Sequence, residues 1–197
     1  KGCSMFLKRT PALLALCIGT STASAGGGEF EPLARDYYKD VISIWANTPT
    51  VINALRANNI EPAGHSASEI ADLDQKWRAE VGNAETPVIS SILNKAASDY
   101  LRERVAASGG AITEIILIDA KGLNAAISSV TSDYFQGDEA QFLEVFHKGS
   151  GYVRVGDVEL DESTQVYQMK VSFPIIDTDT NRALGTMTVA LNPQVIM

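Results

Sequence analysis

The feature that most constrains the fold is a change of hydrophobic period at the glycine pair Gly109-Gly110. Before this pair, apolar residues recur every three or four positions, which is the spacing of amphipathic helices. After it, β-branched and apolar residues form short runs or alternate with polar ones, as strands between turns do. A chain with helices first and strands afterwards is typical of the α+β class.

The part before the glycine pair is expected to hold four helical segments. Ser66 and Glu69 form a capping box, in which each side chain satisfies a backbone donor of the first helical turn. Thr86 is a suitable N-cap and Pro87 a suitable first residue for the last segment, which is expected to be one long helix. The four segments cover residues 37–45, 51–55, 66–81 and 86–105.

The part after the glycine pair is expected to hold five antiparallel strands and one short helix. The strands cover residues 112–118, 123–127, 152–155, 165–176 and 183–191, and the helix covers 138–147. The longest strand alternates, so that Met169, Val171 and Phe173 share one face with Tyr167 and Ile175. The other face, with Gln168, Lys170 and Ser172, is polar. It is either solvated or the floor of a covered pocket.

The N-terminal residues have the pattern of an export signal. Residues 1–25 contain a basic start, an apolar run over 12–18 and the small-residue sequence Ala23-Ser24-Ala25, which predicts a signal peptide that is removed. The run is too short to span a bilayer, which takes about 20 residues. A lipid-anchored signal at Cys17 is the alternative, disfavoured because Leu16 precedes it. Residues 26–31 are expected to be a flexible linker and 32–197 one domain, periplasmic or secreted.

Composition argues against several function classes. The 24 acidic residues outnumber the 16 basic ones, giving a net charge of −8, and such a surface repels nucleic acid and anionic lipid. Both cysteines lie in the predicted leader, so neither thiolate catalysis nor a cysteine metal site is expected. His65 and His147 have no partner at metal-ligand spacing. We predict a non-enzyme without metal or cofactor, with a hydrolase built on a carboxylate pair as the less favoured alternative.

Three stretches of the sequence together resemble the PAS-like extracytoplasmic sensor domains called Cache or PDC domains. They are "IWANTPTVINAL", "EIILIDAKGLNAAIS" and "MKVSFPIIDTDTNRALGTMTVAL", and their order and spacing carry the resemblance from about Pro32 to Asn192. It implies a PAS-like five-stranded antiparallel sheet with long N-terminal helices packed on one face. A ligand would lie on the other face, under a lid at residues 128–146. We expect either a separate membrane receptor or sensor kinase as partner, or a role of the chain as a periplasmic binding component.

The lid contains the aromatic pair Tyr134-Phe135, within "TSDYFQGDEAQF". In the resembled amino-acid sensors an Arg two residues before the pair clamps the ligand carboxylate, and here that position is Ser132. Tyr134 is expected to reach the ligand and Phe135 to be mainly a core residue, although both could be core. Asp133 could bind a ligand amine or cap a local turn.

Charge recognition is therefore expected from the strands. Lys170 and Arg154 could bind a carboxylate, Arg in bidentate fashion and Lys as a point charge. The alternative for both is a solvated side chain paired with Asp157 or Glu159. Neutral hydrogen bonds could come from the same face, from Gln168, Ser172, Ser128, Asn124 and Thr188.

The sequence thus predicts a freestanding extracytoplasmic domain that binds a small organic acid or a zwitterionic metabolite between the polar sheet face and the lid. The competing hypothesis keeps the same fold but fills the pocket, leaving an interaction or structural protein that uses its surface. "DTDTNR" at residues 177–182 is interpreted as a hairpin loop rather than a calcium site, because Arg182 stands where such a loop needs Gly. "DVELDE" at 157–162 is interpreted as an exposed strand edge.

Overall fold

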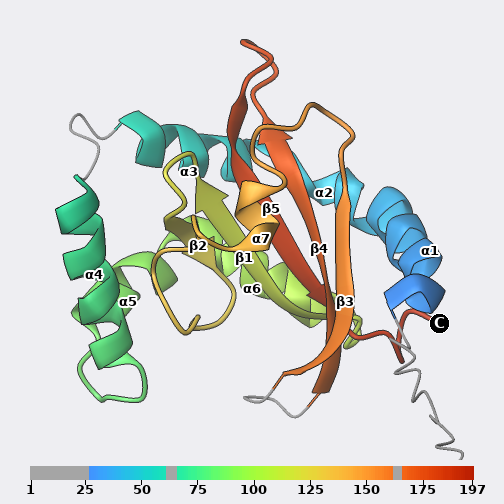
Figure 1. Cartoon of the computed structure of the whole chain (residues 1–197), viewed down its shortest axis with the longest axis horizontal. Helices are drawn as coiled ribbons and strands as arrows, with labels where there is room; N and C mark the ends of the chain where they lie inside the picture. The colour runs from blue at the N-terminus through green and yellow to red at the C-terminus, as the bar shows by residue number, and fades with distance from the viewer. Residues whose placement is uncertain (1–26, 61–65, 162–165) are drawn as a thin grey trace, which may run out of the picture.

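A computed structural model describes residues 27–60, 66–161 and 166–197 (Figure 1). The predicted signal peptide lies outside the described residues. The helical elements are α1 (Gly27–Tyr37), the π-helical turn η1 (Tyr38–Ile42), α2 (Ser43–Ala46), α3 (Pro49–Ile60), α4 (Ala67–Glu80), α5 (Pro87–Leu93), α6 (Ala96–Ala107) and α7 (Ala140–Leu143). The strands are β1 (Ile112–Asp119), β2 (Asn124–Ile127), β3 (Arg154–Asp161), β4 (Val166–Ile176) and β5 (Ala183–Leu191).

The five strands form one antiparallel sheet in the order β2-β1-β5-β4-β3. The predicted α+β class, with five antiparallel strands and helices packed on the sheet, is confirmed. The β1–β2 connection is tight because Asp119 accepts the backbone N–H groups of Lys121 and Leu123, and Gly122 adopts a positive φ of 82°. This arrangement places the first hairpin at one edge of the sheet and the acidic β3 at the other.

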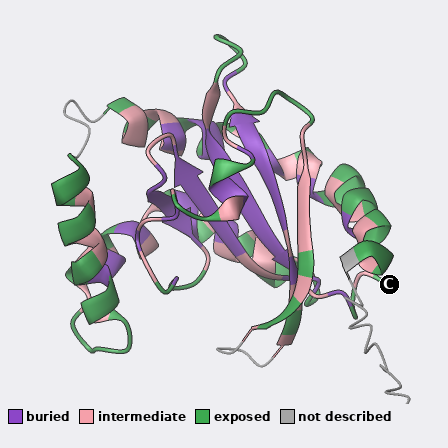
Figure 2. Cartoon of the chain, viewed as in Figure 1, coloured by how far each residue is buried: buried purple, intermediate pink, exposed green. Residues whose placement is uncertain are grey.

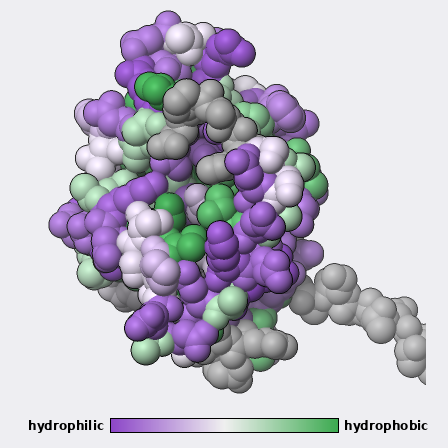
Figure 3. Space-filling model, turned by 90° about the vertical axis from the view of Figure 1, so that its left-hand side faces the viewer, coloured by the Kyte–Doolittle hydropathy of each residue, from purple (hydrophilic) through white to green (hydrophobic). Residues whose placement is uncertain are grey.

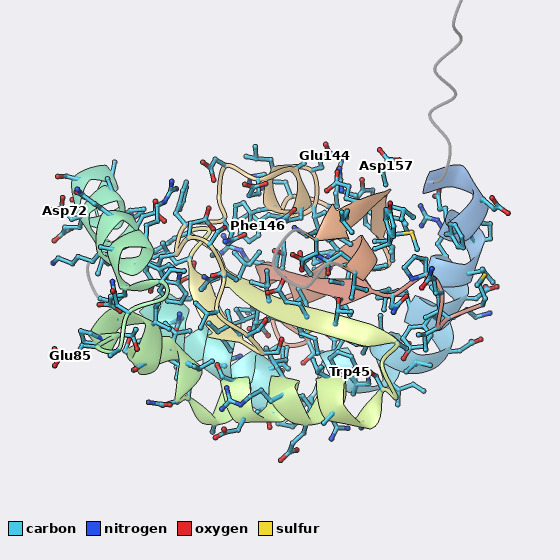
Figure 4. All side chains as sticks on the ribbon, turned by 90° about the horizontal axis from the view of Figure 1, so that it is seen from below. Trp45, Asp72, Glu85, Glu144, Phe146 and Asp157 are labelled. Carbon is cyan, nitrogen blue, oxygen red and sulfur yellow. The ribbon has the colours of Figure 1, made fainter. Side chains whose placement is uncertain are left out.

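The main hydrophobic core lies between the sheet and the helices α1, α3 and α6 (Figures 2 and 4). From the sheet it receives the predicted apolar face of β4 and the matching face of β5; from the helices it receives Leu55 and Leu101, both fully buried. Burying such side chains stabilises the fold by about 1.5–3 kcal/mol each. Tyr167 is an exception on this face. It is 54% exposed because it lies at the sheet end, paired with the exposed Leu160.

A second apolar cluster lies on the opposite face of the sheet, which the sequence predicted to be mainly polar along β4. Its centre is Trp77 of α4, fully buried against Ile116 and Ile118 of β1. Neighbouring residues of β1 point alternately to the two faces of the sheet. Because the run on β1 is apolar at both odd and even positions, this strand supplies side chains to both cores. The polar surface on this face is therefore formed mainly by β3, β4 and β5, together with Glu114 of β1.

The long helix predicted for residues 86–105 is in fact two helices. The first, α5, ends at Leu93 with Asn94 as its C-cap, and α6 begins at Ala96. Ser98, fully buried, donates its hydroxyl to the carbonyl of Ile92 and accepts the backbone N–H of Ile127, so the break is stabilised by a bond to the sheet edge. Thr86 makes no capping bond with its side chain.

The start of α5 is capped by a residue from another helix. The carboxylate of Glu80, at the end of α4, accepts the backbone N–H groups of Val88 and Ile89 at 3.0 and 2.9 Å. An acceptor with a full negative charge is better there than a hydroxyl, because the helix N-terminus carries partial positive charge. This link also fixes the angle between α4 and α5.

Three further boundaries differ from the predictions. Residues 27–31, predicted as flexible linker, form the first turns of α1, where Phe30 packs against the main core and Arg35 pairs with Glu31. The helix expected over 138–147 is limited to α7, although Phe142 and Val145 are buried as predicted. Strand β3 is longer than predicted and includes the described part of the acidic edge sequence.

The β4–β5 hairpin is tied to α3 by one arginine. Arg56 donates to both oxygens of Asp177, at 2.8 and 3.2 Å, and to Asp179 at 2.6 Å. Asp177 also accepts the backbone N–H of Asp179, so the loop is a hairpin turn, as predicted.

Within the described ranges, no helix combines the length and hydrophobicity needed to cross a bilayer.

Candidate functional site

Two cavities lie on the polar half of the sheet face, beneath and beside the segment 128–146. The first, of about 430 Å³, lies between β1, β4 and the loop that follows β2. The second, of about 400 Å³, lies between β3, β4 and α7. They share Asp161, Gln168 and Lys170, so the two cavities adjoin along β4.

The strand register explains why Lys170 and Glu114 face the first cavity together. Both residues pair with Ala190 of β5, Glu114 from one side and Lys170 from the other. Directly paired residues point to the same face, and neighbouring strands are about 4.8 Å apart. The acid and the base therefore stand about 10 Å apart on one face, with only the small side chain of Ala190 between them.

Lys170 has the electrostatic properties expected of a ligand-binding residue. Within the described part of the chain, its side chain makes no hydrogen bond or salt bridge. Gln168, two residues before it, accepts a hydrogen bond from Thr113 at 2.9 Å, which orients its amide. A fixed amide beside an unpaired ammonium group suits a ligand carboxylate.

Glu114 is the acidic counterpart in the first cavity. Burial raises the pKa of its carboxyl group, while the hydroxyl of Ser129 and the charge of Lys170 act in the opposite direction. Ser129 donates to this carboxyl group at 2.9 Å. Because Ser129 lies at the start of the segment 128–146, Glu114 joins the cavity floor to that segment.

The second cavity is more strongly charged. Its wall carries four carboxylates, from Glu139, Asp157, Glu159 and Asp161, and the cations Arg154 and Lys170. Arg154 donates to Glu144, next to α7, at 2.7 Å. Figure 4 shows Glu144 and Asp157 on the same side of the molecule, opposite Trp45 on the helical side. The acids outnumber the bases in both cavities.

The segment 128–146 is attached to α4 through its aromatic pair. The carboxylate of Asp74 accepts the backbone N–H groups of Tyr134 and Phe135, at 2.9 and 3.0 Å. The indole N–H of Trp77 donates to the carbonyl of Thr131 at 2.8 Å. The face on which α4 lies is mostly hydrophilic, with a small hydrophobic group near its middle (Figure 3). The lid therefore rests on a helix as well as on the sheet.

Of the predicted site residues, three on the strands line the cavities and those in the lid do not. Lys170 and Gln168 line both cavities, and Arg154 lines the second. Tyr134 stacks on Trp77 with ring centroids 5.3 Å apart and is 8% exposed, in the second apolar cluster. Phe135 packs against the same cluster. The lid contacts the first cavity instead through Val130, Thr131, Ser132 and Gln136.

The remaining predicted residues have internal partners. Ser172 is fully buried and shares a hydrogen bond of 2.9 Å with Thr188. Ser128 accepts the backbone N–H of Ile115. Asp133 accepts a hydrogen bond from Gln136, and its pKa is raised, chiefly by burial and then by the charge of Asp74. None of these three lines either cavity.

Sequence reasoning missed Glu114, Asp161 and the two buried glutamines Gln136 and Gln141. Glu114 interrupts the apolar run of β1, and an acid in such a run is a signal for a special site. Asp161 belongs to the edge sequence whose acids were interpreted only as protection against pairing. The glutamines, joined through a hydrogen bond of 3.4 Å, had no signal in the local pattern. In the described part of the chain, no three His, Cys, Asp or Glu side chains are arranged so that they could hold a metal ion.

Comparisons with known proteins support the fold. No protein-family model matches the sequence, and no curated protein sequence matches it. Among solved structures, the sensor domain of the histidine kinase DctB from V. cholerae matches with a TM-score of 0.52 and 14% identity, over 86% of this chain and 53% of that one. A domain of a putative sensory box/GGDEF family protein from Vibrio parahaemolyticus gives 0.45 and 12%, over 84% and 56%.

The chain spans about half the length of these matched structures. At 14% identity a likeness shows the fold alone, because one fold serves many functions. The second match, below 0.5, adds no weight. The fold implied by the resemblance to Cache or PDC domains is thus confirmed, as the fold of a histidine-kinase sensor domain.

Proposed function

We propose that this chain is an extracytoplasmic sensing domain that binds a small zwitterionic metabolite in the adjoining cavities beneath the segment 128–146. One observation carries the proposal most directly: Lys170 faces both cavities without a side-chain partner among the described residues, with the carboxyl group of Glu114 on the same face. Lys39 and Lys76 also make no salt bridge in the described residues, but both are exposed, whereas Lys170 is half-buried and lines both cavities.

The distribution of charge favours a zwitterion over a simple organic acid. Lys170 suits a ligand carboxylate, and the acids around it suit a ligand ammonium group about 10 Å or less away. A dicarboxylate would meet Glu114 and Asp161 with like charge, which opposes binding. A ligand with one carboxylate and one amine satisfies both ends.

The fold agrees with this function but does not carry it. The DctB structure is named as the sensor domain of a kinase, and a comparable role here would need a membrane receptor or kinase as partner. Export of the chain, by the predicted signal peptide at residues 1–25, would place the site outside the cytoplasm. We propose that the chain binds its ligand without catalysing a reaction.

The proposal is tested by thermal-shift screening of the purified protein against amino acids, other amines and organic acids. A ligand that binds only the native state raises the melting temperature, by an amount that grows with its concentration. We expect saturable shifts from zwitterions and none from dicarboxylates. If no class produces a shift, the cavities do not bind metabolites, and the surface-interaction alternative is favoured.

A matched pair of variants then tests the site. Lys170→Met removes the charge and keeps most of the side-chain length, and should weaken binding about tenfold or more, as loss of one charged hydrogen bond does. Lys39→Met removes an equal charge from the exposed side chain on η1 and should leave affinity unchanged. Equal loss in both variants would mean that overall charge, and not Lys170, governs binding.

A further inference from the structure

A third cavity, of about 480 Å³, lies away from the two just described and is lined by basic residues. It lies between the loop that follows α7 and the β4–β5 hairpin. His147 and Lys148 come from the loop and Arg182 from the hairpin, with the polar side chains of Ser150 and Asn181 beside them. It shares no lining residue with the first two cavities. No Asp or Glu is among its described lining residues.

The hairpin carries two acids, but both are neutralised on its other side. Asp177 and Asp179 are bound by Arg56 of α3, and this contact lowers the pKa of Asp177. Arg182 therefore keeps its positive charge without a carboxylate partner in the described ranges. The backbone carbonyl of Arg182 accepts the N–H of Asp177 at 2.8 Å, so the hairpin turn fixes the backbone from which the arginine side chain extends.

The loop residues are held by aromatic contacts and not by acids. The imidazole of His147 meets the ring of Phe146 edge-on, with centroids 5.0 Å apart, and Phe146 in turn stacks on the buried Phe142. The ammonium group of Lys148 lies 5.5 Å from the ring centre of Tyr152. Such contacts restrict where a cation can point without cancelling its charge.

We propose that this basic cavity binds a phosphate or sulfate group. Arg182 offers a planar pair of donors that fits such an oxyanion in bidentate fashion, and Lys148 adds a point charge. His147, Ser150 and Asn181 add hydrogen-bond donors. In a protein with a net charge of −8, a local positive cavity without acids is the place where an anion can approach against the overall repulsion. The oxyanion is either free in solution or part of a lipid headgroup.

Calorimetric titration of the purified protein with inorganic phosphate, and separately with sulfate, at constant ionic strength tests the site. Saturable binding is expected, about tenfold weaker for Arg182→Ala because one bidentate contact is lost. Lys148→Ala should weaken it in the same direction. Lys39→Ala, which removes an equal charge from η1, is the matched control and should bind as the unchanged protein does. These side chains are exposed, so the melting temperatures of all three variants should agree.

Vesicles distinguish the two sources of the oxyanion. If the protein binds phosphatidylglycerol vesicles but not phosphatidylcholine vesicles, and Arg182→Ala abolishes this, the group is a lipid headgroup. If free phosphate binds and vesicles do not, the ligand is soluble. The proposal is overturned if neither binds, or if Lys39→Ala weakens binding as much as Arg182→Ala. The zwitterion screen is independent of these results, because the cavities share no residue.

Discussion

The indole ring of Trp77 stacks on the phenol ring of Tyr134, with centroids 5.3 Å apart and an interplanar angle of 22°. This contact joins α4 to the segment that covers the candidate site. Around it, Asp74 and Trp77 together hold three backbone groups of that segment by hydrogen bonds. A change in the position of the segment on ligand binding would therefore be passed to α4, provided that these contacts persist.

Trp77→Phe should destabilise the fold through one lost hydrogen bond and through a smaller ring at a fully buried position. It keeps an aromatic ring but removes the N–H that donates to Thr131, leaving a carbonyl without its partner. The expected loss is about 1–3 kcal/mol of unfolding free energy, the range for an unsatisfied buried group, measured by urea denaturation. Trp45→Phe is the control, because the described structure shows no hydrogen bond from the Trp45 indole. A similar loss of unfolding free energy in both variants would show that the smaller ring, and not the lost hydrogen bond, is the cause.

Asp74→Ala should loosen the lid more than the fold. The backbone N–H groups of Tyr134 and Phe135 would lose a charged acceptor, and their hydrogen exchange should accelerate about 10- to 100-fold, since a tenfold change corresponds to about 1.4 kcal/mol. Asp72→Ala, at an exposed position of the same helix, is the matched control. Unchanged exchange at residues 134 and 135 in Asp74→Ala would show that the two bonds do not hold the lid.

Local patterns were sufficient to predict the α+β class and most of its elements. The period change at Gly109-Gly110, the capping box at Ser66 and the alternation in β4 each depend on neighbours in the sequence, and each was confirmed. The break at Asn94 was not predictable in this way. It is stabilised by Ser98 bonding to Ile127, a contact between residues 29 positions apart.

The site was predicted only where strand alternation determines direction. Lys170 and Gln168 face the cavities because even-numbered residues of β4 point to the polar face of the sheet. This alternation can be read from the sequence. The direction of Tyr134 depends on Trp77, a residue of a separate helix, so a pattern within the lid could not reveal that its ring is buried against α4. Glu114 became part of the site through pairing with Ala190, which requires the register between strands.

Glu114→Gln should change how stability depends on pH. Burial raises the pKa of Glu114 in the folded protein, so the folded state favours the protonated form. This preference stabilises the folded protein at pH values below the pKa of Glu114 in the unfolded chain, about 4.3. The stabilisation is lost as the pH rises through the higher pKa that Glu114 has in the folded protein. A glutamine does not titrate. The melting temperature of the variant minus that of the unchanged protein should therefore increase as the pH rises from about 4 towards neutrality.

Asp133 has a raised pKa for a related reason, and its contribution should remain in the Glu114→Gln variant. The variant should therefore flatten the pH profile only in part. A profile parallel to that of the unchanged protein at every pH would show that Glu114 titrates normally. Serial melting curves in buffers of equal ionic strength provide the measurement.

Arg56→Gln should produce the opposite pH effect. Arg56 lowers the pKa of Asp177, so the stability from this pair is present above the unfolded pKa of about 3.9 and is lost as pH falls through the lower folded pKa. The variant should melt at a lower temperature near neutral pH and lose less on acidification. Arg35→Gln, which breaks the exposed pair with Glu31 and the hydrogen bond to the carbonyl of Val153 but leaves Asp177 untouched, is the control. A constant difference between Arg56→Gln and the unchanged protein from pH 7 to 2 would contradict the linkage.

Ser172→Ala should affect stability and leave ligand affinity unchanged. The hydroxyl of Ser172 is fully buried against that of Thr188, 2.9 Å away, and neither residue lines a cavity. Removing one hydroxyl leaves the other unpaired, at a cost of about 1–3 kcal/mol, whereas removing both can be nearly neutral. The double variant Ser172→Ala with Thr188→Val should therefore recover most of the unfolding free energy lost in the single variant. If instead Ser172→Ala weakens binding of a ligand found by thermal shift while Lys170→Met does not, Ser172 contacts the ligand and the boundary of the site must be moved toward β5.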